Sequence, residues 1–362
     1  MSITPIDPDL YQEQLDQKRA QFKQAFAVHD LPEPEVFTSE PLHYRLRAEF
    51  HIRHEGEELH YVMFQPGKPG IPVLVEDFPV AARSICELMP RLKAALKIAP
   101  LLRHKLFRVD FLATLSGEML LTLVYHKPLD AAWEAAAGEL AGKLEVQLIG
   151  RSRGSKVVLE RDWVLESFEL NGRQLRYKQI EGSFTQPNGG VNRKMLAWAC
   201  RQAENLGDDL LELYCGNGNF TIALAPLFRR VLATELSKSS VEAAQFNLEA
   251  NRIGNVALGR VSSEEFCAAM DGVRPFRRLQ HVDLGSYRFS TLFVDPPRSG
   301  LDDRTLSLAR RFDHILYISC NPETLLQNVA ALADTHRIRS AAVFDQFPYT
   351  HHLESGLLLI RR

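Results

Sequence analysis

The sequence is poor in cysteine, and the few cysteines are not spaced as a framework. Five are scattered along 362 residues with no Cys-x-x-Cys pair: Cys86, Cys200, Cys215, Cys267 and Cys320. An odd, scattered set excludes a disulfide-stapled fold and a structural zinc site. Reduced thiols fit a cytoplasmic protein, so we expect a cytoplasmic location and no bound metal.

Long apolar runs and an excess of one charge sign are missing as well. No uninterrupted apolar run approaches the ~20 residues that cross a bilayer. The acidic, proline-containing N-terminus lacks the regions of a signal peptide, so we expect no membrane association. The formal net charge of −2 gives no general attraction to polyanions. Any nucleic-acid binding must therefore rest on local basic patches.

The N-terminal half mixes helix and strand patterns. Residues 9–28 carry apolar side chains at helical spacing, and 80–96 and 131–144 have helical composition. Alternating or short apolar runs predict strands at three places: 43–53, 119–125 and 144–149. Because the chain is long enough for two cores, we expect an α+β domain over residues 1–180.

The C-terminal half has a different rhythm. Compact apolar runs separated by helical stretches predict buried parallel strands with crossover helices, at 209–213, 230–234, 290–294 and 315–319. Residues 341–344 and 356–360 follow with no helical pattern between them, which predicts an antiparallel terminal pair. We expect an α/β, Rossmann-like domain over residues 181–362.

A glycine turn opens this second domain. Leu-Glu-Leu-Tyr-Cys-Gly-Asn-Gly-Asn-Phe at 211–220 runs from a strand into a helix, and Glu235 ends the next strand, where a carboxylate binds ribose hydroxyls. A dinucleotide and S-adenosylmethionine both fit this arrangement. Thr221 stands where a dinucleotide site needs a third small residue, and Asp-Pro-Pro at 295–297 is typical of methyltransferases, so S-adenosylmethionine is favoured.

Cys320 follows a predicted strand and precedes Asn-Pro-Glu at 321–323. A lone cysteine usually packs as a small hydrophobe. This one lies at the carboxyl edge where α/β sheets bind ligands, before a helix start whose N–H groups could stabilise a thiolate. Glu354 precedes the last strand and could return to the same edge as a base, or form a surface ion pair. The adjacent His351 and His352 share no face and have no third partner, so a metal site is not expected.

With these residues noted, the chain resembles the bacterial tRNA (uracil-5-)-methyltransferases over nearly its whole length. The resemblance rests on the glycine-turn motif and on several others: Asp-Pro-Pro-Arg-Ser-Gly at 295–300, Ser-Cys-Asn-Pro-Glu at 319–323, Phe-Pro-Tyr-Thr-His-His at 347–352, Ser-Phe-Thr-Gln-Pro-Asn at 183–188, Arg-Ala-Glu-Phe at 47–50 and Leu-Arg-His-Lys-Leu-Phe at 102–107.

The resemblance implies S-adenosylmethionine-dependent methylation of uridine C5 in the T-loop of tRNA. It implies that Cys320 adds to C6 of the base and that Glu354 removes the C5 proton. It also implies five cofactor contacts: Gln186, Tyr214, Asn219, Glu235 and Asp295. A ribosomal branch of the family holds an iron–sulfur cluster on four N-terminal cysteines, and Cys86 alone precedes residue 200 here, so no cluster is expected.

The partner implied is the T-arm of tRNA, with other RNAs of T-loop-like fold possible and no membrane or obligatory protein partner. Local basic groups in the N-terminal half suit phosphate contacts beside unpaired, stacked bases: Arg45, Arg47, Arg53, Arg103, His104, Lys105, Arg108, Arg151, Arg153 and Lys156. The target base has to be flipped out of its loop, and Phe107 and Tyr44 are candidates to stack in the gap. Arg298 could pair with Asp295 or contact phosphate.

Three alternatives remain open from the residues alone. An exocyclic-amino methyltransferase also uses a polar residue before Pro-Pro, but it usually carries an aromatic residue where Arg298 stands and does not need Cys320. A cytosine-C5 enzyme has its cysteine in the Asp-Pro-Pro region instead. An RNA-binding folding factor needs only the N-terminal half.

Overall fold

The computed structural model describes residues 6–65, 68–273 and 276–362. The chain forms two compact units. The first is built mainly from Glu40–Ser167 and Gln179–Gly189, and the second from Asp9–Ser39, Phe168–Lys178 and Gly190–Arg362. Across the described ranges, no helix is both long and apolar enough to cross a membrane.

The division differs from the single boundary near residue 180 that the sequence predicts. Helix α1 (Tyr11–Ala25) belongs to the second unit, because Phe22 and the following Phe26 are buried in that unit's core. A two-stranded sheet of β9 (Trp163–Leu170) and β10 (Arg173–Ile180) has residues in both units. The chain therefore passes between the units more than once.

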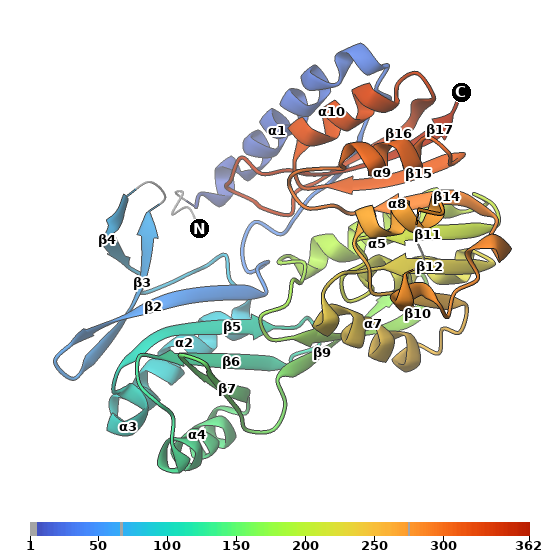
Figure 1. Cartoon of the computed structure of the whole chain (residues 1–362). Helices are drawn as coiled ribbons and strands as arrows, with labels where there is room; N and C mark the ends of the chain where they lie inside the picture. Colours follow the sequence, from blue (N-terminus) through green and yellow to red (C-terminus); the bar gives the residue numbers. More distant parts are fainter. Residues whose placement is uncertain (1–5, 66–67, 274–275) are drawn as a thin grey trace. The chain divides into compact units, whose positions relative to one another are not determined.

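The first unit is a seven-stranded sheet with helices, as predicted for an α+β domain (Figure 1). Its helices are α2 (Arg83–Lys97), α3 (Pro100–Arg103) and α4 (Ala131–Leu144). All neighbouring strands are antiparallel except β6 and β7, which α4 connects. The strands lie in this order: β4 (Lys68–Leu74), β3 (Glu58–Gln65), β2 (Arg47–Glu55), β5 (Leu106–Ala113), β6 (Met119–Tyr125), β7 (Gln147–Ser152) and β8 (Ser155–Val158).

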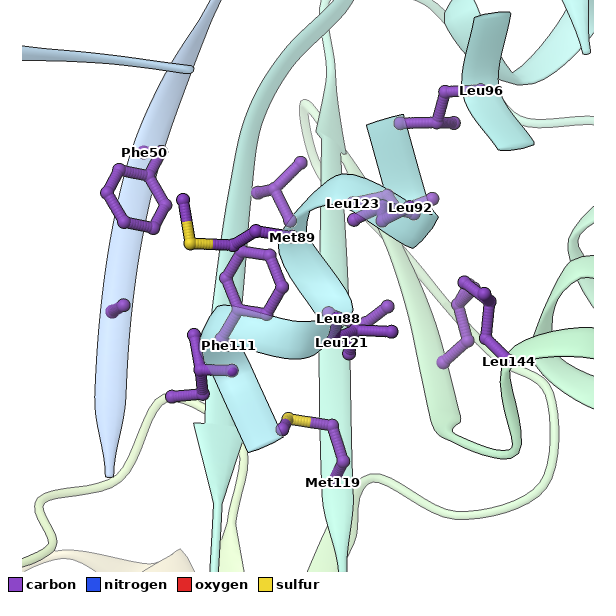
Figure 2. Packing of buried hydrophobic residues seen from close by; sticks show 14 of the residues in the cluster. Phe50, Leu88, Met89, Leu92, Leu96, Phe111, Met119, Leu121, Leu123 and Leu144 are labelled. Carbon is purple, nitrogen blue, oxygen red and sulfur yellow. The ribbon is translucent and has the colours of Figure 1, made fainter. Parts of the chain in front are cut away.

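One face of this sheet is covered by α2 and α4. Figure 2 shows Phe50 and Phe111 of the strands beside Leu88, Met89 and Leu92 of α2, all of them buried. A fully buried side chain of this size contributes about 1.5–3 kcal/mol to folding. Helix α2 continues past an internal proline, Pro90, which costs about 3 kcal/mol in a helix because it lacks an N–H donor. The packing of α2 against the sheet offsets this cost. A separate, smaller apolar cluster also forms, from Leu112, Leu120 and Ile149 of the sheet together with Val164.

The second unit is an eight-stranded, mostly parallel sheet, and the Rossmann-like prediction is confirmed. Strand β17 is antiparallel between β15 and β16, as the predicted terminal pair requires. The order is β1 (Glu35–Phe37), β16 (His336–Phe344), β17 (Glu354–Arg361), β15 (His314–Ser319), β14 (Phe289–Val294), β11 (Asp209–Leu213), β12 (Arg230–Thr234) and β13 (Val256–Gly259).

Helices cover both faces of this sheet, because neighbouring strand residues point to opposite sides. Leu210 faces the core formed with α5 (Gly189–Ala203), α6 (Asn219–Leu224) and α7 (Lys238–Ala250). Leu211 faces the opposite core, whose helices are α1, α8 (Ser263–Met270), α9 (Asp303–Ala309) and α10 (Pro322–Leu332). Burial on both faces explains why these strands are continuous apolar runs.

The strand order places the ends of four strands at one edge. The chain runs from β11 through β12 to β13 on one side, then returns to β14 and β15 on the other. Ligands of such sheets bind where the order reverses, beyond the carboxyl ends of the strands. Because β17 is antiparallel to β15, its first residue lies at that same edge.

Candidate functional site

The edge brings Cys320 and Glu354 together. Cys320 follows the last residue of β15, and Glu354 begins β17. Ser319 pairs with Ser355 across the two strands, and the Ser355 hydroxyl donates to the Ser319 carbonyl at 3.3 Å. Cys320 directly follows one member of this last pair and Glu354 directly precedes the other, so the two residues lie close enough for their charges to interact. Asp295 joins them from the end of neighbouring β14.

Burial and mutual charge keep protons on this group. Burial, then Glu354 and Asp295, raise the pKa of the Cys320 thiol to about 11, and Arg298 opposes them. Burial also raises the pKa of Glu354 well above its usual value, with Asp295 adding to the shift and Arg298 reducing it. The pKa of Asp295 rises to about 7 through burial. A positive charge brought to this edge would favour the ionised forms of all three groups.

Among the described residues, Arg298 forms no ion pair with Asp295. Its Nη2 contacts the His352 ring instead, at 2.7 Å from Nδ1 and 3.2 Å from Nε2. Burial, then His351 and Arg298, lower the pKa of His352 to about 4. His352 is therefore neutral near pH 7 and can accept from the Arg298 guanidinium. Among described residues, no group of three or more His, Cys, Asp or Glu side chains is arranged to hold a metal ion.

The start of α10 contributes less to the thiol than the sequence predicts. The Asn321 N–H donates to the Ser319 hydroxyl at 3.1 Å, and the Glu323 N–H donates to the Asn321 side chain at 3.1 Å. These helix-start donors are used within the turn itself. The backbone of Cys320 itself lowers the pKa of the thiol, but less than burial, Glu354, Asp295 or Arg298 changes it.

The glycine turn follows β11 and faces Glu235. Tyr214, Gly216 and Gly218 all have φ between 56° and 83°, so the chain folds back sharply before α6. The Glu235 carboxylate accepts from the Gly216 N–H at 3.1 Å and from the Ser237 N–H at 2.7 Å. A side chain at Gly216 would meet no atom within 4 Å. The turn is therefore open on this side, as a bound ligand requires.

Two other predicted cofactor residues are fixed by side-chain partners. The Tyr214 hydroxyl donates to the Ser263 hydroxyl at 2.8 Å. Asn219, the first residue of α6, exchanges two hydrogen bonds with Asn192 of α5, at 3.0 Å and 2.9 Å. Both side chains therefore have set orientations beside the turn.

Gln186 lies in the first unit, unlike the other six predicted residues. Its segment is tied to that unit by the Leu46 N–H, which donates to the Pro187 carbonyl at 2.7 Å, and by Arg47, which donates to the Ser183 carbonyl at 2.9 Å. Six of the seven predicted residues thus belong to one edge of the second unit, and Gln186 belongs to the first unit.

Glu212 is a residue that the sequence analysis missed. It is the next-to-last residue of β11, is 1% exposed, and its carboxyl oxygens make no hydrogen bond of ordinary geometry with any described residue. Burial and Asp295 raise its pKa to about 8, against the opposing effect of Thr221. An acidic residue between two leucines of a predicted buried strand was the available signal.

The edge therefore suits a positively charged ligand. Glu212, Glu235, Asp295 and Glu354 all stand on it or beneath it, and none of the four forms an ion pair with a basic side chain of the described residues. S-adenosylmethionine carries a sulfonium and an ammonium, so the acidic groups fit the expected cofactor. The open glycine turn and the Glu235 carboxylate supply room and hydroxyl acceptors.

In the first unit, an aromatic group lies on β2, β5 and the end of β6. Phe107 stacks on His126 with ring centroids 4.1 Å apart, and His51 meets Phe107 edge-on at 4.9 Å. Phe107 is half-buried and His126 exposed. Tyr44, the other candidate for stacking on RNA, is only 9% exposed and belongs to the core.

Many of the predicted basic groups are partly neutralised. Arg108 pairs with Glu49 at 3.0 Å and with Asp110 at 2.9 Å. Arg151 makes a two-pronged contact with Glu181 at 2.7 Å and 2.5 Å. Burial lowers the pKa of Arg47. Arg108 and Arg151 are held in place by carboxylates, and a bound phosphate would have to compete with those carboxylates.

Comparisons with known proteins show the family of this chain. The family model described as tRNA (Uracil-5-)-methyltransferase matches residues 10–362. The tRNA/tmRNA (uracil-C(5))-methyltransferases of Aromatoleum aromaticum and Dechloromonas aromatica are each 65% identical over 362 residues, which is 100% of this chain and 98% and 100% of those proteins.

A solved structure shares the fold. The Pyrococcus abyssi tRNA (uracil-54, C5)-methyltransferase in complex with S-adenosyl-L-homocysteine superposes with a TM-score of 0.74 at 22% identity, covering 97% of this chain and 83% of that one. The family match decides between the three classes of methyltransferase left open by the residues, and the predicted resemblance is confirmed. The chain belongs to the tRNA (uracil-5-)-methyltransferase family.

Proposed function

We propose that this chain methylates uridine C5 in the T-arm of tRNA through a covalent adduct on Cys320, with Glu354 as the general base. As a member of its family it is an S-adenosylmethionine-dependent tRNA uracil-C5 methyltransferase. The residue roles and the T-arm are the proposed part. The observation that carries them is the register of β15 and β17, which makes Cys320 and Glu354 neighbours at the carboxyl edge.

The chemistry needs a nucleophile because C5 of uracil is too weakly nucleophilic to accept a methyl group unaided. The Cys320 sulfur forms a bond to C6, and the electrons of the C5–C6 double bond move toward the C4 carbonyl, leaving C5 nucleophilic. After C5 has gained the methyl group, Glu354 takes the C5 proton. The returning electrons restore the double bond and expel the thiolate, so the enzyme is regenerated.

Protonation has to change before this can begin. The high pKa of Cys320, about 11, leaves the resting thiol protonated near pH 7. Arg298 favours the ionised forms of both Cys320 and Glu354. S-adenosylmethionine, when bound, supplies the methyl group and a positive sulfonium, whose charge also favours the thiolate and the carboxylate.

We assign the cofactor contacts to Gln186, Tyr214, Asn219, Glu235 and Asp295. Glu235 has the strongest support, since its carboxylate ends β12 and faces the open glycine turn, where ribose hydroxyls are bound in such folds. Asp295 is supported by its place beside Cys320 and Glu354.

We assign RNA recognition to the first unit. The stacked pair of Phe107 and His126 offers an aromatic surface for an unpaired base. The T-arm is the proposed target, and other RNAs with a T-loop-like fold would present the same bases; two relatives carry tmRNA in their names. A tRNA substrate and unpaired cysteines support a cytoplasmic location.

The covalent step is tested with tRNA containing 5-fluorouridine. Fluorine at C5 cannot leave as a proton, so the adduct should persist as a protein–RNA band on a denaturing gel. We expect the band with the intact chain, none with Cys320→Ala, and an undiminished band with Cys86→Ala, a second partly buried thiol. With ordinary tRNA, Glu354→Gln should accumulate the adduct. A band from Cys320→Ala, or none from the intact chain, contradicts the mechanism.

A further inference from the structure

A buried ion pair joins the N-terminal helix to the segment that precedes Glu354. Lys18 of α1 donates from Nζ to Asp345 Oδ1 at 2.7 Å, and the two side chains are 5% and 0% exposed. The same nitrogen donates to the Phe347 carbonyl at 3.0 Å. Both partners lie in the segment 345–353, which links β16 to β17 and is neither helix nor strand.

Other residues of α1 hold the same segment. The Tyr349 N–H donates to Gln14 Oε1 at 2.5 Å, and the ring of Tyr11 meets the ring of Tyr349 edge-on at 6.3 Å. Tyr349 has φ of 61°, a left-handed conformation that is unfavourable for a side-chain-bearing residue unless its surroundings fix it. One face of α1 therefore sets the path of the chain just before Glu354.

Cys320 and Glu354 share one support, because Cys320 follows β15, Glu354 begins β17, and these two strands pair. Their other supports differ. Cys320 is also held through the pairing of β15 with β14 and by the Ser319 and Asn321 contacts at the start of α10. Glu354 pairs with Phe344 of β16, and the segment 345–353 between these two residues is held by α1 and by the contact of Arg298 with His352. A shift of this segment would therefore move the carboxyl of Glu354 more than the thiol.

We propose that Lys18, through its pair with Asp345, is a positioning residue that aims Glu354 at the C5 proton. This inference rests on the proposed role of Glu354. The proposed role gives the N-terminal helix a part in proton removal, although Lys18 and Asp345 are 327 residues apart in the chain.

The test compares the two steps in a variant that removes both charges, Lys18→Met/Asp345→Asn, because a single substitution would leave a buried charge unpaired. Adduct formation is followed with 5-fluorouridine tRNA in a single turnover. Proton removal is followed as tritium released from tRNA labelled at uridine C5. The matched control is Lys23→Met, an exposed lysine on the same helix that pairs with Glu33.

We expect adduct formation to stay within about twofold of the unsubstituted chain, since Cys320 is unaffected. Tritium release should fall by about 10- to 100-fold, the loss typical of a misplaced catalytic group. The adduct should accumulate with ordinary tRNA, and the control should match the unsubstituted chain. If the double variant does not fold, Lys18→Arg, which keeps the charge of the pair but changes the length of the side chain, is measured in the same way, with the same split expected.

Equal loss in both steps would mean that the pair only stabilises the fold, and unchanged tritium release would mean that it does not aim Glu354. Either result overturns the inference. The parent proposal is judged separately by Cys320→Ala and Glu354→Gln. If those two behave as described above and the Lys18 variant does not, only the positioning role is wrong.

Discussion

Buried acids dominate the chemistry of this protein at the scale of single residues. Burial raises the pKa of Cys320, of Glu354 and of Asp295, and each acid also raises that of the thiol. Arg298 is the cation that opposes them, and the neutral His352 ring holds it. The site is thus poised to bind positive charge and to ionise when that charge arrives.

Glu212 gives a measurable pH dependence of stability. Its folded pKa of about 8 lies above the ordinary value of 4.5, so the folded chain keeps a proton that the unfolded chain releases. The free energy of unfolding should therefore fall as pH rises from about 5 to 8, by up to about 4 kcal/mol from this group. Glu212→Gln should remove that component, as chemical denaturation at pH 5 and pH 8 would show.

The control for Glu212 is Glu249→Gln, which changes an exposed glutamate of α7. Its stability difference between the two pH values should equal that of the unsubstituted chain. If Glu212→Gln leaves the pH dependence unchanged, the carboxyl is not held protonated in the folded state.

At the scale of elements, α1 shows that a local sequence pattern can predict a helix without predicting where that helix packs. The apolar spacing of residues 9–28 predicts a helix, and the structure has one at Tyr11–Ala25. The same spacing cannot specify which core the helix joins, because any apolar surface would accept it. Its contacts with Asp345 and Tyr349, far along the chain, decide that it belongs to the second unit.

Phe22 tests this placement. It is 2% exposed and packs against Phe26 with ring centroids 4.6 Å apart. Phe22→Ala should lower the free energy of unfolding of the second unit by about 3–5 kcal/mol, the range for removing a buried phenylalanine. Val28→Ala, at a residue 84% exposed, should change it little. Denaturation followed by Trp198 fluorescence would measure both, and equal stabilities would place α1 outside the core.

At the scale of the whole molecule, two units divide the work we propose. Phe107→Ala should weaken tRNA binding by about 1–3 kcal/mol, the contribution of one stacked base, and leave S-adenosylmethionine binding unchanged. Phe246→Ala, a partly exposed aromatic of the second unit, is the matched control for surface changes. Filter binding of tRNA and calorimetry of the cofactor give the two affinities. Loss of cofactor affinity in Phe107→Ala would contradict the division.

The central strands of the second unit were predicted closely, and those of the first unit only in part. Strands β11, β12, β14 and β15 are buried on both faces, so they appear as continuous apolar runs. The strands missed at or next to an edge of the two large sheets are β3, β4 and β8 of the first unit and β1 and β13 of the second. Strand β5 was also missed, although it lies in the middle of its sheet, because Arg108 and Asp110 interrupt its apolar pattern.

By itself, the sequence determined the two fold classes and the family, and it predicted which residues form the site, because glycine turns, strand-end acids and strand periods are local features. Tertiary structure alone decided that α1 joins the second unit, that Arg298 pairs with His352, that Glu212 is buried, and that Lys18 meets Asp345. Burial and long-range pairing depend on how elements pack, and packing is specified by the whole chain at once.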